Sequence, residues 1–216
     1  AIARSPRVLL LDEPFSALDR TTRQRLYIEL RRLHRDLGCT VILVTHDLDE
    51  AAQLASQLML VRHGACLQSG PATEVLTRPS STAAARLLDI PNVFRARAEP
   101  GPPGRPWDLR WGPHRLRVPG VAAMSGDCGF AVLPQNVLLV RPDKPWDVHL
   151  ENPIPALVVE SMALGAEWIL WLEPDGLPGT RLQMRLPARA VGRYALDQGK
   201  RVTVCLRGAD IVPLAS

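Results

Sequence analysis

Two adjacent carboxylates near the start of the chain have the residue types and the position for metal-assisted hydrolysis. Asp12 and Glu13 follow the apolar run of residues 8–11 and precede Pro14. That run predicts a buried strand of a parallel sheet, and Pro14 ends its pairing. Successive strand residues point to opposite faces, so one acid can hold Mg²⁺ through water while the other orients or deprotonates an attacking water. The alternative for a bare Asp-Glu pair is two solvated acids in a turn.

Two further features favour the chemical interpretation. The tetrapeptide Ser16-Ala17-Leu18-Asp19 follows the acids at once. His46 follows a second apolar run, residues 40–45, which predicts another buried strand. Ligands of open parallel sheets bind at the carboxyl ends of the strands. The sequence therefore predicts that the acids and the imidazole lie at one edge of a sheet.

Helical segments are predicted to hold these strands in place. Residues 20–37 form a helix with an apolar stripe, for which Asp19 is the expected N-cap and Gly38 the expected C-cap. The stripe consists of Leu26, Leu30, Leu33 and Leu37. Asp47 is predicted to cap a second helix, with Glu50 at capping-box spacing. A hairpin around His63-Gly64 and two short helices near residues 72–77 and 82–88 follow.

The composition changes near Pro91. Residues 1–91 contain 8 Gly and Pro, whereas residues 92–216 contain 27 and all five tryptophans. The first part alternates strand runs with helical periods, which is typical of an α/β domain. The second part shows short strands between turn residues, which predicts an all-β domain, a small barrel or sandwich. We therefore predict two domains, 1–91 and 92–216, with a separate core in the second.

The β-rich part carries a degenerate twofold repeat. The stretches LPQNVLLV at 133–140 and LRGADIVPL at 206–214 both join an apolar residue, a turn and an apolar run. The two halves would be residues 92–148 and 149–216. Strands are expected near residues 93–98, 109–111, 115–118, 130–133, 137–141, 156–162, 168–173, 181–186, 201–206 and 211–214.

Composition excludes several classes of protein. The net charge is only +4 over 216 residues, with two lysines and no basic run, so a nucleic-acid partner is not expected. No apolar stretch reaches the length of a membrane span, and no secretory signal opens the chain. The four cysteines are far apart, which predicts reduced thiols rather than disulfides or a metal cluster.

The segment from residue 8 to residue 47 resembles the ATP-binding-cassette (ABC) ATPases of membrane transporters. VLLLDEP is similar to their Walker B motif, SALD to their D-loop and VTHD to their switch-histidine loop. Residues 1–6 resemble the end of the helix that follows the family's signature motif, and residues 56–81 the segment that closes the importer domain. The resemblance implies that Asp12 supports Mg²⁺, that Glu13 is the general base, and that His46 contacts the γ-phosphate of ATP. Ser16 and Asp19 would bind across a homodimer to the partner's nucleotide.

The same resemblance shows which motifs this sequence does not contain. No GxxxxGK[ST] motif, LSGGQ-like signature or glutamine loop occurs in the 216 residues. We therefore expect the C-terminal portion of an ATPase, a partial P-loop domain that does not hydrolyse ATP by itself.

Residues 92–216 resemble the transport-associated OB-like (TOBE) domains of importer ATPases. NVFRARAEP, GFAVLPQNVLLVRPD and RVTVCLRGADIVPL carry this likeness, although Leu133-Pro134-Gln135-Asn136 replaces the family's usual Arg-Pro-Glu-Asp turn. The resemblance implies a subunit on the cytoplasmic face of the inner membrane, bound to permease subunits and served indirectly by a solute-binding protein. The solute could be molybdate, sulfate, ferric iron, a polyamine or a sugar. The alternative function is a non-catalytic regulatory or small-anion-binding module built on the TOBE-like domain.

Overall fold

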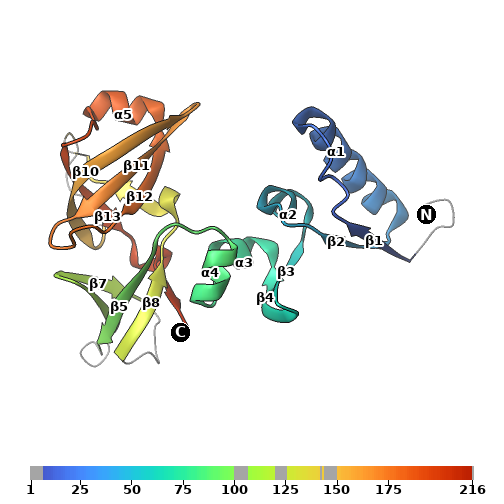
Figure 1. Cartoon of the computed structure of the whole chain (residues 1–216), viewed down its shortest axis with the longest axis horizontal. Helices are drawn as coiled ribbons and strands as arrows, with labels where there is room; N and C mark the ends of the chain where they lie inside the picture. Colours follow the sequence, from blue (N-terminus) through green and yellow to red (C-terminus); the bar gives the residue numbers. More distant parts are fainter. Residues whose placement is uncertain (1–6, 100–106, 120–125, 142, 144–149, 216) are drawn as a thin grey trace. The chain divides into compact units, whose positions relative to one another are not determined.

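A computed structural model of the chain describes residues 7–99, 107–119, 126–141, 143 and 150–215 (Figure 1). The expected helix end at residues 1–6 therefore lies outside the described residues. The chain divides into two compact units, Ala1–Leu76 and Thr77–Ser216. Among the described residues, no helix is both long and apolar enough to cross a bilayer.

The N-terminal unit is built around two parallel strands. Strand β1 (Val8–Asp12) pairs in register with β2 (Thr40–Val44), and helix α1 (Arg20–Leu37) connects them. Helix α2 (Leu48–Leu54), the hairpin β3 (Gln57–Arg62) and β4 (Ala65–Pro71), and helix α3 (Ala72–Thr77) follow. The predicted helix caps and hairpin are confirmed, because Asp19 accepts from the amides of Thr21 and Thr22 and Gly38 adopts the left-handed conformation. These features are local, so neighbouring residues suffice to specify them.

The prediction of two fully buried strands is wrong for the described chain. One face of the β1–β2 pair is shielded and contains Leu9, which is 7 % exposed. The other face leaves Val8, Leu10, Ile42 and Val44 between 50 % and 68 % exposed. A two-stranded sheet is marginal in water by itself. The exposed apolar face of β1 and β2 is therefore suited to a larger sheet than the two described strands.

The apolar stripe of α1 also differs from the prediction. Leu26 is 39 % exposed, whereas Tyr27, one residue further on, is 3 % exposed. The Tyr27 ring meets Phe15 edge to face, with ring centroids 4.9 Å apart. Aromatic packing of this kind buries more area than a leucine would, and it rotates the buried face of the helix toward Tyr27.

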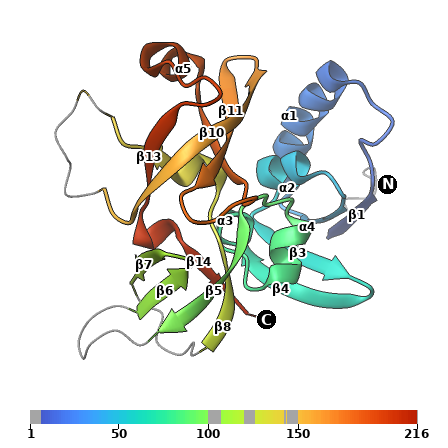
Figure 2. The same ribbon diagram turned by 60° about the vertical axis from the view of Figure 1, so that its left-hand side comes forward.

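The C-terminal unit consists of two five-stranded sheets over one hydrophobic core (Figure 2). The first sheet has the order β14-β8-β5-β6-β7 and the second the order β12-β11-β10-β13-β9. Buried side chains from both sheets form the core, including Leu109, Phe130, Ile154, Leu170 and Val204. The first sheet comprises β5 (Val93–Glu99), β6 (Trp107–Trp111), β7 (His114–Val118), β8 (Gly126–Ala131) and β14 (Val212–Leu214). The second comprises β9 (Val137–Leu139), β10 (Pro153–Leu164), β11 (Glu167–Pro174), β12 (Leu182–Pro187) and β13 (Arg201–Leu206).

The two sheets have the same strand order, and each takes its last strand from the other half. Strands β5, β6, β7 and β8 occupy the positions of β10, β11, β12 and β13 in the other sheet. A 3₁₀ turn then leads to the exchanged strand: Pro134–Asn136 precedes β9, and Gly208–Asp210 precedes β14. These turns lie in the two stretches whose likeness suggested a repeat. The exchange makes the two halves mutually dependent, because each completes the other's sheet.

Two buried asparagines join the sheets at equivalent places. Asn92 precedes β5 and exchanges two hydrogen bonds with the backbone of Gln183 in β12. Asn152 precedes β10, and its amide bonds the backbone of Arg117 in β7 and the carbonyl of Leu206. Both side chains are at most 8 % exposed. Buried amides with satisfied donors and acceptors fix the register of one sheet against the other.

Helices make this unit less purely β than predicted. Helix α5 (Ala188–Tyr194) lies between β12 and β13 and anchors Val191, which is 7 % exposed, in the core. No strong helical period marks this segment, so the sequence analysis missed it. The strand predicted near 130–133 ends earlier, at Ala131, because the chain turns there into the 3₁₀ segment.

The boundary between the units lies earlier than the change of composition. Helix α4 (Thr82–Leu87) belongs to the C-terminal unit, and its Ala84 and Ala85 are fully buried. The segment before it bonds the chain terminus, since the Ala215 amide donates to the Ser80 carbonyl and the Thr82 amide donates to the Ala215 carbonyl. Gly and Pro content follows local turns, whereas the boundary depends on these distant contacts.

Residues 77–216 are expected to unfold cooperatively as an isolated polypeptide, and residues 92–216 to be less stable. The shorter chain loses α4 together with Leu88 and Ile90, which are 6 % and 8 % exposed. Burial of two such side chains contributes roughly 3 kcal/mol or more. Urea unfolding followed by tryptophan fluorescence measures the difference. Equal unfolding midpoints for the two polypeptides would place the boundary at residue 92 after all.

Candidate functional site

The five residues singled out by the sequence lie at the carboxyl ends of β1 and β2 and in the turn that follows β1. Asp12 ends β1 opposite Val44, the last residue of β2. Glu13 follows, and its amide donates to the Val44 carbonyl at 2.9 Å. Glu13 has φ +46°, an uncommon value for a residue other than Gly, Asn or Asp. The backbone therefore turns sharply at the residue proposed as the base.

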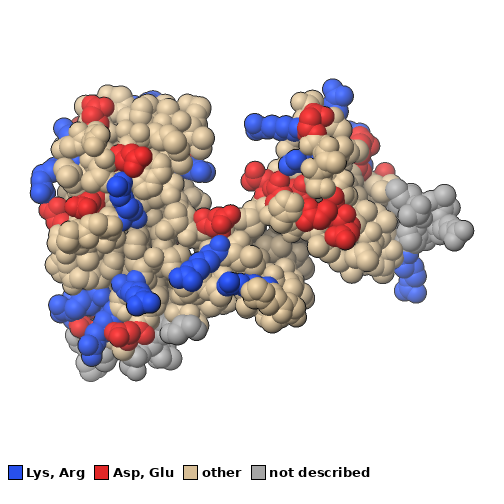
Figure 3. All heavy atoms as spheres, in the orientation of Figure 1, with Lys and Arg blue, Asp and Glu red and all other residues tan. Residues whose placement is uncertain are grey.

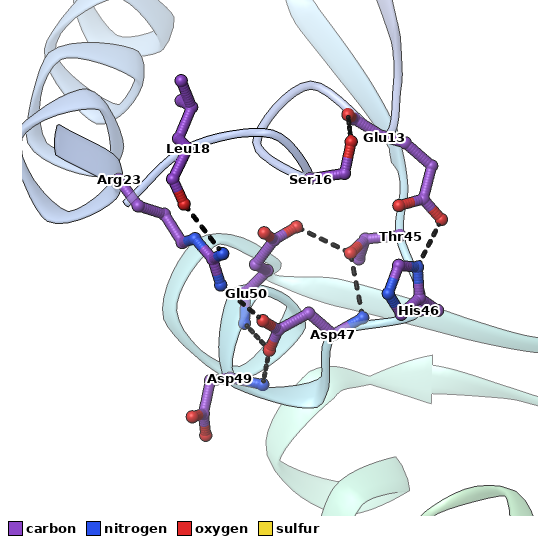
Figure 4. A network of polar contacts seen from close by, with 9 residues as sticks. All are labelled: Glu13, Ser16, Leu18, Arg23, Thr45, His46, Asp47, Asp49 and Glu50. Carbon is purple, nitrogen blue, oxygen red and sulfur yellow. Dashed lines mark hydrogen bonds and ion pairs between the residues drawn. The ribbon is translucent and has the colours of Figure 1, made fainter. Parts of the chain in front are cut away.

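The structure brings Glu13 and His46 together although 33 positions separate them. Oε1 of Glu13 lies 2.7 Å from Nδ1 of His46 (Figure 4). The glutamate side chain is 37 % exposed and the imidazole 80 % exposed, so both are accessible to a ligand. A carboxylate in hydrogen-bond contact with an imidazole is an arrangement that can orient water and transfer a proton.

Ser16 and Asp19 lie in the turn between β1 and α1, and both make local contacts. The Ser16 hydroxyl donates to the Glu13 carbonyl at 3.0 Å. The Asp19 carboxylate caps α1, accepting from the Thr21 and Thr22 amides at 3.0 and 3.1 Å. Hydrogen bonds from Thr22 hold the pKa of the Asp19 carboxyl below its ordinary value. The Ser16 hydroxyl thus contacts the backbone of Glu13, and the Asp19 carboxylate contacts the backbone of α1. Among the described residues, neither group hydrogen-bonds the side chain of Glu13 or of His46.

An arginine that the sequence analysis did not single out connects the two loops of the site. Arg23 of α1 donates from Nη1 to Asp47 at 3.0 Å and from Nη2 to the Leu18 carbonyl at 3.2 Å. It thereby links the turn after β1 with the residue that follows His46 (Figure 4). Its Nε is buried and has no partner among the described groups. Sequence spacing gave no signal for this link, because Arg23 and Asp47 are 24 positions apart.

The start of α2 differs in one respect from the predicted capping box. Asp47 caps the helix as expected, accepting from the amides of Asp49 and Glu50. Glu50, however, accepts from the Thr45 hydroxyl at 2.6 Å instead of returning to the Asp47 amide, which donates to Thr45 Oγ1. Thr45, the residue before His46, is therefore held by two hydrogen bonds: it donates to Glu50 and accepts from the Asp47 amide. Burial, followed by the nearby Glu50 charge, raises the pKa of Tyr27.

The charge of the site is acidic, and its donor atoms suit a hard cation. Asp and Glu side chains gather on the face of the N-terminal unit where α2 lies (Figure 3). Among the described residues no group of three or more His, Cys, Asp or Glu forms a ready metal cluster. Mg²⁺ is usually held by one or two carboxylates together with phosphate oxygens and water. The exposed carboxylate of Asp12 fits that kind of site.

We expect His46 to titrate above the ordinary value of 6.5. The hydrogen bond that the imidazole donates to the Glu13 carboxylate, and then the negative charge of that carboxylate, raise the pKa of His46. The charged pair is complete below the ordinary pKa and is lost as the pH rises through the raised pKa. An NMR titration of the imidazole measures this. In Glu13→Gln the pKa should fall back toward 6.5, and an unchanged pKa would show that the contact does not persist in solution.

The chain is similar in sequence to import ATP-binding proteins. No family model matches the chain. The Fe(3+) ions import ATP-binding protein FbpC of Streptomyces coelicolor is 36 % identical over 214 residues, 99 % of this chain and 56 % of that protein. The sulfate/thiosulfate import ATP-binding protein CysA 2 of Chromobacterium violaceum is 32 % identical over 221 residues, 98 % of this chain and 55 % of that protein. The chain thus spans about half the length of these curated relatives.

One solved structure is also similar. A molybdate-bound form of the cytoplasmic molybdate-binding protein ModG matches 58 % of this chain and 96 % of its own, with 15 % identity and a TM-score of 0.48.

Proposed function

Because the chain is related over nearly its whole length to the ATP-binding subunits of ABC importers, we propose that it contributes the hydrolytic acids and the switch histidine of such an ATPase. The observation that carries the proposal is the contact between Glu13 and His46 at the carboxyl ends of two adjacent parallel strands. In the sequence, Asp12 precedes Glu13, and the turn of residues 16–19 follows Glu13. This order resembles that of a Walker B strand, a D-loop and a switch histidine, and the contact between Glu13 and His46 supports the proposal.

The residues divide the work by chemistry. Asp12 would hold Mg²⁺, which supplies charge neutralisation at the phosphates of ATP when bound. Glu13 would orient and deprotonate the attacking water, and its accessible carboxylate supports that role. His46 would donate to the γ-phosphate, where negative charge develops. Ser16 and Asp19 would contact the nucleotide of a second copy, although the carboxylate of Asp19 already serves as a helix cap here.

The exposed apolar face of β1 and β2 supports the proposal that this chain is part of a larger ATPase domain. Four aliphatic side chains, Val8, Leu10, Ile42 and Val44, are at least half exposed there. A contiguous apolar face of this kind is normally buried by further structure. The relatives are nearly twice as long as the matched region. We infer that the phosphate-binding half of the domain covers this face.

The wider assignment follows from the same relatives. We infer a homodimer of ATPase subunits bound to inner-membrane permease subunits, on the cytoplasmic face, with a solute-binding protein as an indirect partner. The names of the two relatives specify iron(III) and sulfate or thiosulfate as imported solutes. We propose that the solute is an oxyanion or ferric iron, with a polyamine or a sugar as the remaining classes.

The 216-residue chain alone is expected to show no Mg-ATP turnover above background. It contains no GxxxxGK[ST] loop to hold the phosphates, so ATP has no backbone cradle or lysine to bind. Joined to the phosphate-binding half of a relative, the same chain should hydrolyse ATP. Phosphate release measures both proteins. Steady-state hydrolysis by the isolated chain would contradict the proposed division of the site.

A second candidate function is a regulatory or small-anion-binding module built on the C-terminal unit. The observation that favours it is a pair of basic grooves beside α5, lined by Arg141, Arg189 and Arg193 among others.

A further inference from the structure

Two adjoining grooves in the C-terminal unit are lined by residues of α5, β9, β12 and β13 and by the residues that follow β9. Their volumes are about 540 and 750 Å³, and both are lined by Leu139, Arg193 and Tyr194. Volumes of this size are those of small-molecule sites. The grooves lie far along the chain from Glu13 and His46, and the proposed ATPase chemistry makes no use of them.

The smaller groove is strongly basic. It is lined by Arg141, Arg189 and Arg193 and by no carboxylate among its described residues. Arg189 and Arg193 are one turn apart on α5, a spacing at which like charges destabilise a helix. The described part of the structure gives no ion pair for Arg141 or Arg189. Three exposed guanidinium groups thus line one groove, and among the described residues only that of Arg193 has a carboxylate partner.

The larger groove shows how a carboxylate is bound at this place. Asp143 accepts from Arg193 Nη2 at 2.6 Å and from the Tyr194 hydroxyl at 3.1 Å. A guanidinium and a phenol are therefore already arranged around one carboxylate. Lys200 and Arg201 line the same groove, and Arg201 is paired with Asp175. Within the described residues, Lys200 makes no ion pair.

Apolar side chains complete the lining. Leu139 and Leu186 lie in the smaller groove, and Leu139, Leu196 and Val202 in the larger one. Leu186 and Leu196 are only 8 % and 1 % exposed. Leu139 and Val202 are partly exposed, so a carbon skeleton would bury them, whereas an inorganic ion would leave them uncovered. Arginine binds carboxylates with two parallel hydrogen bonds, which favours a planar acid group over a simple halide.

We propose that the grooves beside α5 bind a small organic anion with two or more acidic groups, of the polycarboxylate class. One acid group lies against Arg141 and Arg189, the carbon skeleton covers Leu139, and a second acid group takes the donors of Arg193 and Tyr194 in place of Asp143. This inference deepens the second candidate function. It is independent of the ATPase proposal, because binding is measured beside α5 and turnover depends on Glu13.

Citrate is the probe for the test, and the 216-residue chain is the protein. A titration at pH 7 followed by NMR should shift amide signals in α5, β9 and β13, with saturation. Arg189→Gln and Arg141→Gln should each weaken binding by about tenfold, because each removes a charge-assisted contact with the first acid group. Arg185→Gln is the matched control, since this exposed arginine of β12 lies outside both grooves and pairs with Glu167 at 3.8 Å. It should leave the affinity unchanged.

Three results would overturn the proposal. One is the absence of saturable binding of citrate to the parent chain, while NMR spectra show that the variants fold as the parent chain does. Another is an equal loss of affinity in Arg185→Gln and Arg189→Gln, which would indicate screening of the general surface charge. The third is inorganic phosphate binding as tightly as citrate, since a single inorganic anion uses neither the apolar lining nor the second acid position.

Discussion

Glu13→Gln is expected to lower ATP turnover by about 10²–10⁴-fold while leaving nucleotide binding nearly intact, in a protein that joins this chain to a phosphate-binding segment. Glutamine keeps the shape of the side chain and one hydrogen-bonding oxygen but cannot accept a proton. The carboxylate lies 2.7 Å from Nδ1 of His46 and is partly exposed, so water can reach it. Phosphate release measures turnover, and a fluorescent nucleotide measures binding.

Two companion variants make this experiment decisive. Glu74→Gln, an exposed acid of α3, should retain full turnover. His46→Ala should also reduce turnover strongly, because contact with the γ-phosphate stabilises the transition state. Near-normal turnover in Glu13→Gln would show that another group is the base, whereas equal losses in Glu13→Gln and Glu74→Gln would indicate a general effect of acidic charge.

The second large effect is expected at Asn152. Its side chain makes three hydrogen bonds, at 2.7 to 3.0 Å, to the backbone of Arg117 and Leu206. Asn152→Ala leaves these groups without partners between the two sheets, at a cost of about 3 kcal/mol in the free energy of unfolding. The residue also has φ +49°, which alanine tolerates less well than asparagine. Urea unfolding of the chain measures the loss.

Other substitutions separate the two causes. Asn152→Gly accepts the positive φ but makes no side-chain bonds, so it isolates the contribution of the hydrogen bonds. Gln198→Ala, at an exposed position before β13, is the control and should change stability by less than about 0.5 kcal/mol. If Asn152→Gly were as stable as the parent chain, the bridge between the sheets would contribute little.

Sequence alone determined the features that depend on near neighbours. Asp19, Gly38 and Asp47 were identified as helix caps because their side chains or conformations act within four residues. Short strands between turn residues likewise predicted the β-rich part. The acids and the histidine were named from residue type and motif order, and their placement on two neighbouring parallel strands follows from the βαβ pattern.

Tertiary structure decided what depends on distant partners. No local signal states that Tyr27 rather than Leu26 faces the core, because Phe15 determines that choice. Helix α4 belongs to the C-terminal unit through bonds to Ala215, more than 100 positions away. Arg189 and Arg193 of α5 line a basic groove together with Arg141 only because β9, the strand exchanged from the other half, pairs with β13. The physical reason is that caps and turns are satisfied within a few residues, whereas burial and charge depend on which surfaces the folded chain brings together.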